Sequence, residues 1–214
     1  MAQESRHRLV PRTVVLLLAL SAVVAGGALF TACSSGSSTS TQSPGGSSQP
    51  PGAVEPEKNP PGDIPDDQAF VAYHSDAGGY TVDVPEGWAR TQSGPNVSFV
   101  DKLDSIAVEI TAGAEAPTVA SAEANDVPLL QTQVEAFEKV MVKAIDLPAG
   151  KAVLIRYRAN SAPDAVTGKK VRLEIDRFEL FKGGKLAVIS LSAPAGSDNV
   201  DVWNQISNSF KWTP

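Results

Sequence analysis

The chain has 214 residues, a formal net charge of −6 and a single cysteine, Cys33. The acidic balance argues against nucleic acid as a partner, because phosphate binding requires clustered Lys and Arg. A single cysteine excludes an intramolecular disulfide and a metal site built from several thiolates.

The start of the chain has the three parts of a secretory signal peptide, which are a basic region, an apolar run and small residues before a cleavage site. Arg6, Arg8 and Arg12 supply the basic region, and residues 14–25 form the apolar run. This run is shorter than the roughly 20 residues that a membrane-spanning helix needs. We therefore expect residues 1–32 to be removed during export by general secretion. An uncleaved membrane anchor is the alternative.

Cys33 has the most specific chemical prediction in this chain. It follows the small residues Thr31 and Ala32. The sequence from Ala28 to Cys33 resembles a lipobox, the motif at which bacterial lipoproteins are cleaved and acylated. The resemblance implies that Cys33 carries diacylglycerol and palmitate and tethers the chain to the extracytoplasmic face of the cell membrane. Two or more acyl chains anchor a protein stably, because each buried methylene contributes about 0.8 kcal/mol.

Residues 33–66 are rich in Ser, Gly and Pro. Because they have too few apolar side chains to offset the entropy cost of ordering, we expect a flexible tether. About 30 residues of this kind have a mean reach of about 30 Å. Removal of residues 1–32, which hold three Arg and one Glu, leaves 15 basic and 23 acidic residues, a net charge of −8. The lipid is therefore expected to be the whole membrane attachment.

Residues 67–214 have the length of one domain, and alternating apolar and polar side chains predict strands in most of it. Tight turns join consecutive strands. The clearest is Lys182–Lys185, whose two glycines adopt positive φ readily. The apolar positions change register between Ile175 and Phe178, which predicts a β-bulge near Arg177. The expected strands are 80–84, 97–101, 106–111, 139–143, 151–159, 171–180 and 186–191.

Two segments carry apolar stripes at helical spacing. The first lies within residues 118–138, with Asp126 as its expected N-cap, and the second follows Pro194, with Ser197 or Asp198 as its expected N-cap. The stripe residues are Leu130, Val134 and Phe137 in the first segment and Val202, Trp203, Ile206 and Phe210 in the second. Strands outnumber helices and follow one another as hairpins. We therefore expect an α+β domain in which an antiparallel β-sheet of about six to seven strands packs with two or three helices.

Three short segments resemble the PsbP-like fold. They are residues 79–88 (GYTVDVPEGW), residues 147–150 (LPAG) and residues 207–210 (SNSF). Over most of residues 70–212, the chain is similar to the LpqN/LpqT group of actinobacterial cell-envelope lipoproteins. The resemblance implies an α/β/α sandwich with an antiparallel sheet. It also implies a non-enzymatic role as a binding or accessory domain for envelope proteins or lipid-linked molecules, and it brings no set of active-site residues.

Few residues of the exported part are candidates for chemistry. His74 is its single histidine, and we expect an ordinary edge or loop residue there. A two-histidine metal site is then excluded in a monomer, and no metal or cofactor is expected. Glu174 and Asp176 are candidates for the acid–base pair of an exported hydrolase of cell-wall glycans. We favour the alternative, in which they form cross-strand ion pairs with Arg156 and Arg158.

Tyr80, Trp88 and Tyr157 are candidate ligand-binding residues, because aromatic side chains offer a large contact area to an apolar ligand. The alternative is that all three belong to the core. Residues 198–201 (DNVD) carry oxygen donors, but they lack the spacing of a calcium loop, and a helix N-cap explains them better. The sequence thus favours a membrane-tethered, non-catalytic binding or accessory domain. A glycan hydrolase and a carrier of apolar ligands are the alternatives.

Overall fold

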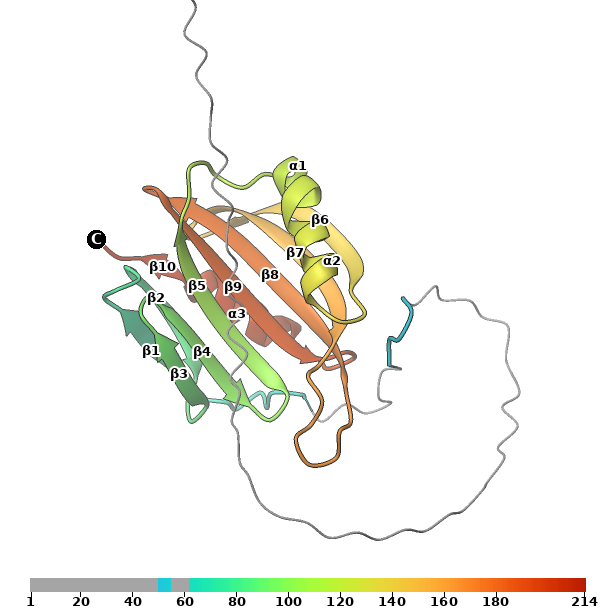
Figure 1. The fold of residues 1–214 in the computed structure, drawn as a ribbon. Helices are drawn as coiled ribbons and strands as arrows, with labels where there is room; N and C mark the ends of the chain where they lie inside the picture. Colours follow the sequence, from blue (N-terminus) through green and yellow to red (C-terminus); the bar gives the residue numbers. More distant parts are fainter. Residues whose placement is uncertain (1–49, 55–61) are drawn as a thin grey trace, which may run out of the picture. The chain divides into compact units, whose positions relative to one another are not determined.

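Two antiparallel sheets form the framework of the computed structural model, which describes residues 50–54 and 62–214 (Figure 1). The expected signal peptide and Cys33 lie outside the described residues. The smaller sheet has the strand order β1 (Phe70–Ser75), β2 (Tyr80–Pro85) and β10 (Lys211–Trp212). The larger sheet has the order β3 (Ala89–Ser93), β4 (Asn96–Asp101), β5 (Asp104–Ala112), β9 (Lys185–Pro194), β8 (Arg172–Lys182), β7 (Gly150–Asn160) and β6 (Glu138–Leu147).

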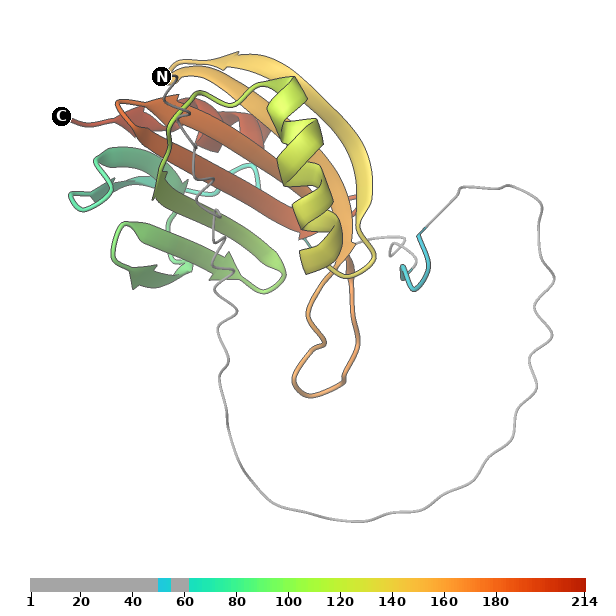
Figure 2. The same ribbon diagram turned by 45° about the horizontal axis from the view of Figure 1, so that its top comes forward.

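Helices lie on both faces of the seven-stranded sheet. Three short elements follow one another directly and form one helical segment across one face, as Figure 2 shows. They are α1 (Val119–Ser121), the π-helical turn η1 (Ala122–Asp126) and α2 (Val127–Gln133). The helix α3 (Val200–Ser209) lies on the opposite face with the smaller sheet (Figure 1). The domain is therefore α+β, the class that the sequence predicts, with a second small sheet that it did not predict.

The first helical segment begins earlier than expected. Thr118 is its N-cap, and its Oγ1 accepts a hydrogen bond from the Ser121 backbone N–H at 3.0 Å. Ser121 Oγ in turn accepts from the Thr118 backbone N–H at 2.9 Å, which completes a capping box. Asp126, the expected N-cap, lies inside the segment in helical conformation, and its side chain does not cap α2. That expectation was wrong because the stripe of apolar residues starts at Leu130, about three turns after the helical segment begins at Val119.

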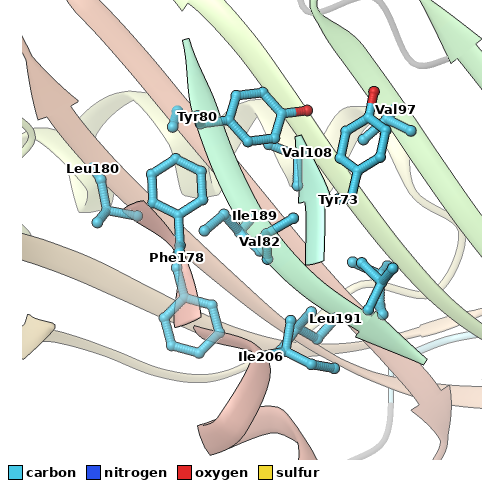
Figure 3. Close-up of a cluster of buried hydrophobic side chains, with 14 of the residues drawn as sticks. Tyr73, Tyr80, Val82, Val97, Val108, Phe178, Leu180, Ile189, Leu191 and Ile206 are labelled. Carbon is cyan, nitrogen blue, oxygen red and sulfur yellow. The ribbon is translucent and has the colours of Figure 1, made fainter. Parts of the chain in front are cut away.

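The larger hydrophobic core fills the space between the two sheets and α3 (Figure 3). Tyr80 stacks on Phe210 with their ring centroids 5.4 Å apart, and Trp212 meets Phe210 edge-on at 5.2 Å. Phe210 directly follows α3 and is fully buried. Burial of one such aromatic side chain contributes about 2–3 kcal/mol, so these rings hold the smaller sheet and α3 against the larger sheet.

A second, smaller core lies beneath the α1–η1–α2 segment, and the two cores together explain the change of register in β8. Ile175 belongs to this smaller core, whereas Phe178 and Leu180 point to the opposite face and belong to the larger one. The pairing of β8 with β7 and β9 is regular along the whole strand. The β-bulge expected near Arg177 is therefore wrong, because burial of both faces moves the apolar positions without an extra residue.

Among the described residues, no helix is both long and apolar enough to cross a membrane.

Candidate functional site

The three aromatic candidates do not meet at one place. Tyr80 is fully buried between the sheets, where its hydroxyl donates to the Pro95 carbonyl at 3.2 Å and burial raises its pKa. Trp88 is half-buried at the border of the same core. Tyr157 lies on the other face of the large sheet, stacked on Phe137 with a centroid distance of 5.3 Å. Tyr80 and Tyr157 therefore pack as members of two different cores.

His74 lies on the edge strand β1, as expected, and its side chain is half exposed. Its Nε2 atom lies 2.8 Å from an Asp76 carboxylate oxygen. In residues 50–54 and 62–214, no group of three or more His, Cys, Asp or Glu side chains is arranged to hold a metal ion.

Cross-strand ion pairs join β7 and β8, as the sequence predicts. Asp176 lies opposite Arg156, and its carboxylate accepts two hydrogen bonds from that guanidinium, at 2.5 and 2.6 Å. Glu174 lies opposite Arg158 and accepts from its Nε at 2.9 Å. The Arg156–Asp176 pair is bidentate, and such pairs are strong because both of their hydrogen bonds are charge-assisted.

These pairs are part of a longer chain of alternating charge, which we call the arginine–carboxylate ladder. Its six residues are three arginines and three carboxylates across β6, β7 and β8, namely Arg156, Arg158, Arg172, Glu138, Glu174 and Asp176. Arg172 is 1% exposed and donates to Glu138 at 2.7 Å and to the Ala136 carbonyl at 2.7 Å. The ladder is neutral overall, so its burial leaves no net charge in the sheet.

The ladder bears directly on the hydrolase alternative. A glycoside hydrolase needs a protonated carboxyl group and a second carboxylate facing it across the scissile bond. Glu174 and Asp176 instead point into the ladder and share Arg156, which lies 4.0 Å from Glu174 and 2.5 Å from Asp176. The geometry therefore favours a structural role for both carboxylates.

A second charged cluster lies on the face of the large sheet that the α1–η1–α2 segment covers, and the sequence did not single it out as a unit. Arg177 and Glu179 are both buried, and the Arg177 Nε donates to Glu179 at 2.9 Å. Burial raises the pKa of the Glu109 carboxyl, and the nearby Arg177 partly offsets this. A sequence pattern that assigns charged residues to the surface cannot predict that two charged residues at i and i+2 of one strand are both buried.

The described parts of the expected tether contact the domain, which the sequence did not predict. Asn199 donates from Nδ2 to the Gly62 carbonyl at 2.7 Å, and its Oδ1 accepts from the Ile64 N–H at 2.8 Å. The Asp198 N–H donates to Asp63 Oδ1 at 2.9 Å, and Ile64 is buried. Asn199, and neither Ser197 nor Asp198, is the residue before α3, and its side chain holds the incoming chain instead of capping the helix.

Asn160 makes a similar contact further up the chain. Its Nδ2 donates to the Gly52 carbonyl at 2.9 Å, and its Oδ1 accepts from the Val54 N–H at 3.2 Å. It also donates to Glu135, which pairs with Lys170 at 2.6 Å. Both contacts lie at the same end of the large sheet, where β7 ends and where the chain passes from β9 to α3. The extent of the tether, residues 33–66, stays a prediction.

No protein-family model matches the sequence, and no curated protein is similar to it in sequence. Among solved structures, cyanobacterial PsbP from Synechocystis matches with a TM-score of 0.51 and 16% identity, over 68% of this chain and 93% of that one.

Two further solved structures match less closely. LpqN of Mycobacterium tuberculosis, described as involved in cell envelope biogenesis, has a TM-score of 0.43 and 18% identity, over 70% of this chain and 93% of that one. A Ran-binding protein of Saccharomyces cerevisiae has a TM-score of 0.47 and 11% identity, over 68% of this chain and 96% of that one. The likeness to cyanobacterial PsbP, together with the antiparallel sheets described above, shows that the domain has a PsbP-like α+β fold.

Proposed function

We propose that this protein is an exported lipoprotein whose PsbP-like domain serves as a non-catalytic binding or accessory module at the extracytoplasmic face of the cell membrane. The observation that carries the proposal is the sequence from Ala28 to Cys33, which follows a basic and then an apolar segment. A diacylated cysteine at this position supplies stable attachment without a basic surface patch. The remaining sequence supports attachment through the lipid. Removal of residues 1–32 leaves a net charge of −8, so the charge of the chain does not itself attract it to an anionic membrane.

The arrangement of the charged side chains supports a binding role over a catalytic one. The two carboxylates that a hydrolase requires, Glu174 and Asp176, are each engaged by an arginine in the ladder. His74 points to solvent on an edge strand. The binding targets that we propose are envelope proteins or lipid-linked molecules, in line with the resemblance of residues 79–88, 147–150 and 207–210 to the LpqN/LpqT group.

Mass spectrometry of the protein purified from membranes tests the anchoring half of this proposal. We expect the mature chain to begin at Cys33 and to carry a diacylglycerol thioether together with the mass of the fatty acyl groups. A chain that retains residues 1–32 with an unmodified Cys33 thiol would contradict it.

Photo-crosslinking in living cells tests the binding half. A photoreactive residue replaces Val71 on the edge strand β1 or Val166 in the loop after β7, since these side chains are 44% and 93% exposed. An unrelated lipoprotein with a probe in an exposed loop serves as control. We expect one envelope protein or lipid to be enriched over that control, and equal recovery of all species from both proteins would count against a specific binding role.

A further inference from the structure

A five-residue sequence occurs twice within the expected tether. Residues 50–54 read PPGAV and residues 60–64 read PPGDI, so the second copy begins ten residues after the first. Both copies contain Pro-Pro-Gly and end on a β-branched aliphatic residue, Val54 in the first and Ile64 in the second. The two tether segments that contact the domain therefore belong to one repeated sequence.

One asparagine binds each copy through the same backbone groups. Asn199 donates to the Gly62 carbonyl at 2.7 Å and accepts from the N–H two residues later, that of Ile64, at 2.8 Å. Asn160 makes the equivalent two hydrogen bonds with the first copy, at 2.9 and 3.2 Å. A side-chain amide carries both a donor and an acceptor, so it can pair with a carbonyl and an N–H of one segment at once.

Glycine is required in both copies, for different physical reasons. Gly52 has a φ of +80° at the third position of a tight turn, residues 50–53, which a backbone hydrogen bond of 3.1 Å closes. Gly62 instead lies against the buried Pro194 ring and Ser197, and a Cβ atom at position 62 would collide with both. A larger residue is therefore disfavoured at position 52 by the backbone conformation and at position 62 by contact with the domain.

The two copies differ in how deeply they are buried. Asn199 is 2% exposed and Asn160 is 8% exposed. Ile64 is buried, whereas Val54 is only partly buried. Because the second copy has the shorter hydrogen bonds and buries more of its apolar side chain, it should bind more tightly than the first.

The chain's own repeat is long enough to occupy both sites at once. Asn160 ends β7, and Pro194 ends β9, with β8 between these two strands. A strand spacing of about 4.8 Å puts β7 and β9 about 10 Å apart. Seven residues separate Val54 from Gly62, and a chain of this length reaches up to about 25 Å.

We propose that Asn160 and Asn199 are two docking sites of one kind, which bind the backbone of Pro-Pro-Gly-x-(Val/Ile) segments and are occupied by the chain's own repeat. If Cys33 is lipidated, as proposed above, the free part of the tether then ends at residue 49. Its mean reach falls from about 30 Å to about 20–25 Å. The docking sites belong to the domain and do not depend on lipidation.

Hydrogen exchange on the full-length protein follows each site through one amide, Val54 for the Asn160 site and Ile64 for the Asn199 site. We expect both amides to exchange more slowly than in an unstructured peptide, and Ile64 more slowly than Val54. Asn160→Ala should speed the exchange of Val54 at least about tenfold and leave Ile64 unchanged, because it removes two hydrogen bonds from one copy only. Asn199→Ala should do the reverse. The matched control is Asn204→Ala, at an exposed position of α3, which should change neither amide.

The two glycines give a second test, because they are required for different reasons. Asn adopts positive φ more readily than most other residues, so Gly52→Asn should retain the protection of Val54 better than Gly52→Val. Gly62→Asn should lower the protection of Ile64 at least about tenfold, since its side chain would collide with Pro194.

Three results would overturn the proposal. The first is exchange of either amide in the natural protein at the rate of an unstructured peptide. The second is a single asparagine variant that releases both copies or neither, because separate sites lose only their own segment. The third is protection that falls on dilution, since the repeat of a second molecule would then occupy the sites.

The test remains decisive if a variant does not fold. If Asn199→Ala is unfolded by circular dichroism, Gly62→Asn replaces it, and unchanged protection of Ile64 in that variant contradicts the proposal. Because lipidation is measured separately on Cys33, either proposal can fail alone.

Discussion

Arg172 shows at the scale of one residue why charge alone does not predict exposure. Arg and Glu are normally surface residues, yet this guanidinium is 1% exposed at the first position of β8. It is satisfied by Glu138 and by the Ala136 carbonyl, which come from the segment around the start of β6. Alternation along β8 correctly predicted that Arg172 belongs to the face of Glu174, but no local pattern could show that tertiary structure covers it.

Replacement of Arg172 by Met should lower the free energy of unfolding by about 3 kcal/mol, because it leaves Glu138 and the partly buried Ala136 carbonyl without this donor. Urea denaturation followed by circular dichroism measures this loss. The matched control is Arg158→Met, whose side chain is 39% exposed and which should cost less than about 1 kcal/mol. Equal losses in both variants would show that burial of the ladder has no energetic consequence.

The contacts of the two asparagines that hold residues 52–54 and 62–64 could not be predicted from the sequence, for a different reason. Asn is common at turns and helix caps, so Asn160 and Asn199 each had an ordinary local interpretation. Their actual partners lie 108 and 137 residues away along the chain. The one local signal was Ile64, an apolar residue within a polar tract, which is buried in the structure.

At the scale of elements, the strands that the sequence predicted are those with one buried and one polar face. The strand β2 buries Tyr80, Val82 and Val84 while Thr81 and Asp83 lie half-exposed between them. The strand β3 was missed because all five of its residues are exposed, so no alternation marks it. The strand β10 has only two residues and depends entirely on pairing with β2. The strand β1 was also missed, and only its fourth and sixth residues are buried.

The edge strand β6 carries the one register irregularity of the large sheet. It falls between Lys139 and Met141, and the intervening Val140 is 40% exposed. Bulges are frequent at sheet edges, where they twist the strand away from pairing with another chain. The predicted bulge near Arg177 was on a central strand, where continuous pairing on both sides leaves no room for an extra residue.

The capping box of the first helical segment gives a test at this scale. Thr118→Ala removes the acceptor for the Ser121 N–H and should destabilise the protein by about 1 kcal/mol. Thermal unfolding compared with Thr118→Ser measures the cost, since serine keeps the hydroxyl and should remain close to the natural protein. A loss of the same size in both variants would mean that the threonine methyl group, and not the cap, is responsible.

At the scale of the whole molecule, opposed pKa shifts predict a stability maximum in mildly acid solution. Burial raises the pKa of Asp104 to about 7 and also raises that of Glu109. The contribution of these two protonated carboxyl groups to stability is therefore lost as the pH rises above their ordinary pKa values. Hydrogen bonds from Lys170 and from Thr167 lower the pKa of Glu135 and Asp164, so their contribution is lost as the pH falls.

The melting temperature should therefore be highest near about pH 5 and decline towards neutral pH. Differential scanning calorimetry across the range measures this profile. Asp104→Asn should flatten the decline between about pH 5 and about pH 7, whereas Asp101→Asn should leave it in place. A profile that rises steadily towards neutral pH would contradict the assignment of a protonated, buried Asp104.

The fold class of the whole molecule could be predicted well from the sequence, because hairpin turns and strand alternation are local signals. The ion pairs between Arg156 and Asp176 and between Arg158 and Glu174 followed from the same alternation, once β7 and β8 were paired. The separation of Tyr80 from Tyr157 did not follow, since it depends on which face of the large sheet each layer covers.

Membrane attachment through Cys33 is the central claim, and fractionation of cells that express the natural protein or Cys33→Ser tests it most directly. Both proteins are followed with the same antibody after cell disruption and sedimentation of membranes, and extraction with salt and with detergent separates electrostatic from lipid attachment. We expect the natural protein to stay in the membrane fraction until detergent is added and Cys33→Ser to be released to the soluble or secreted fraction. A Cys33→Ser protein that remains in the membrane and resists salt would contradict attachment through a lipid on this cysteine.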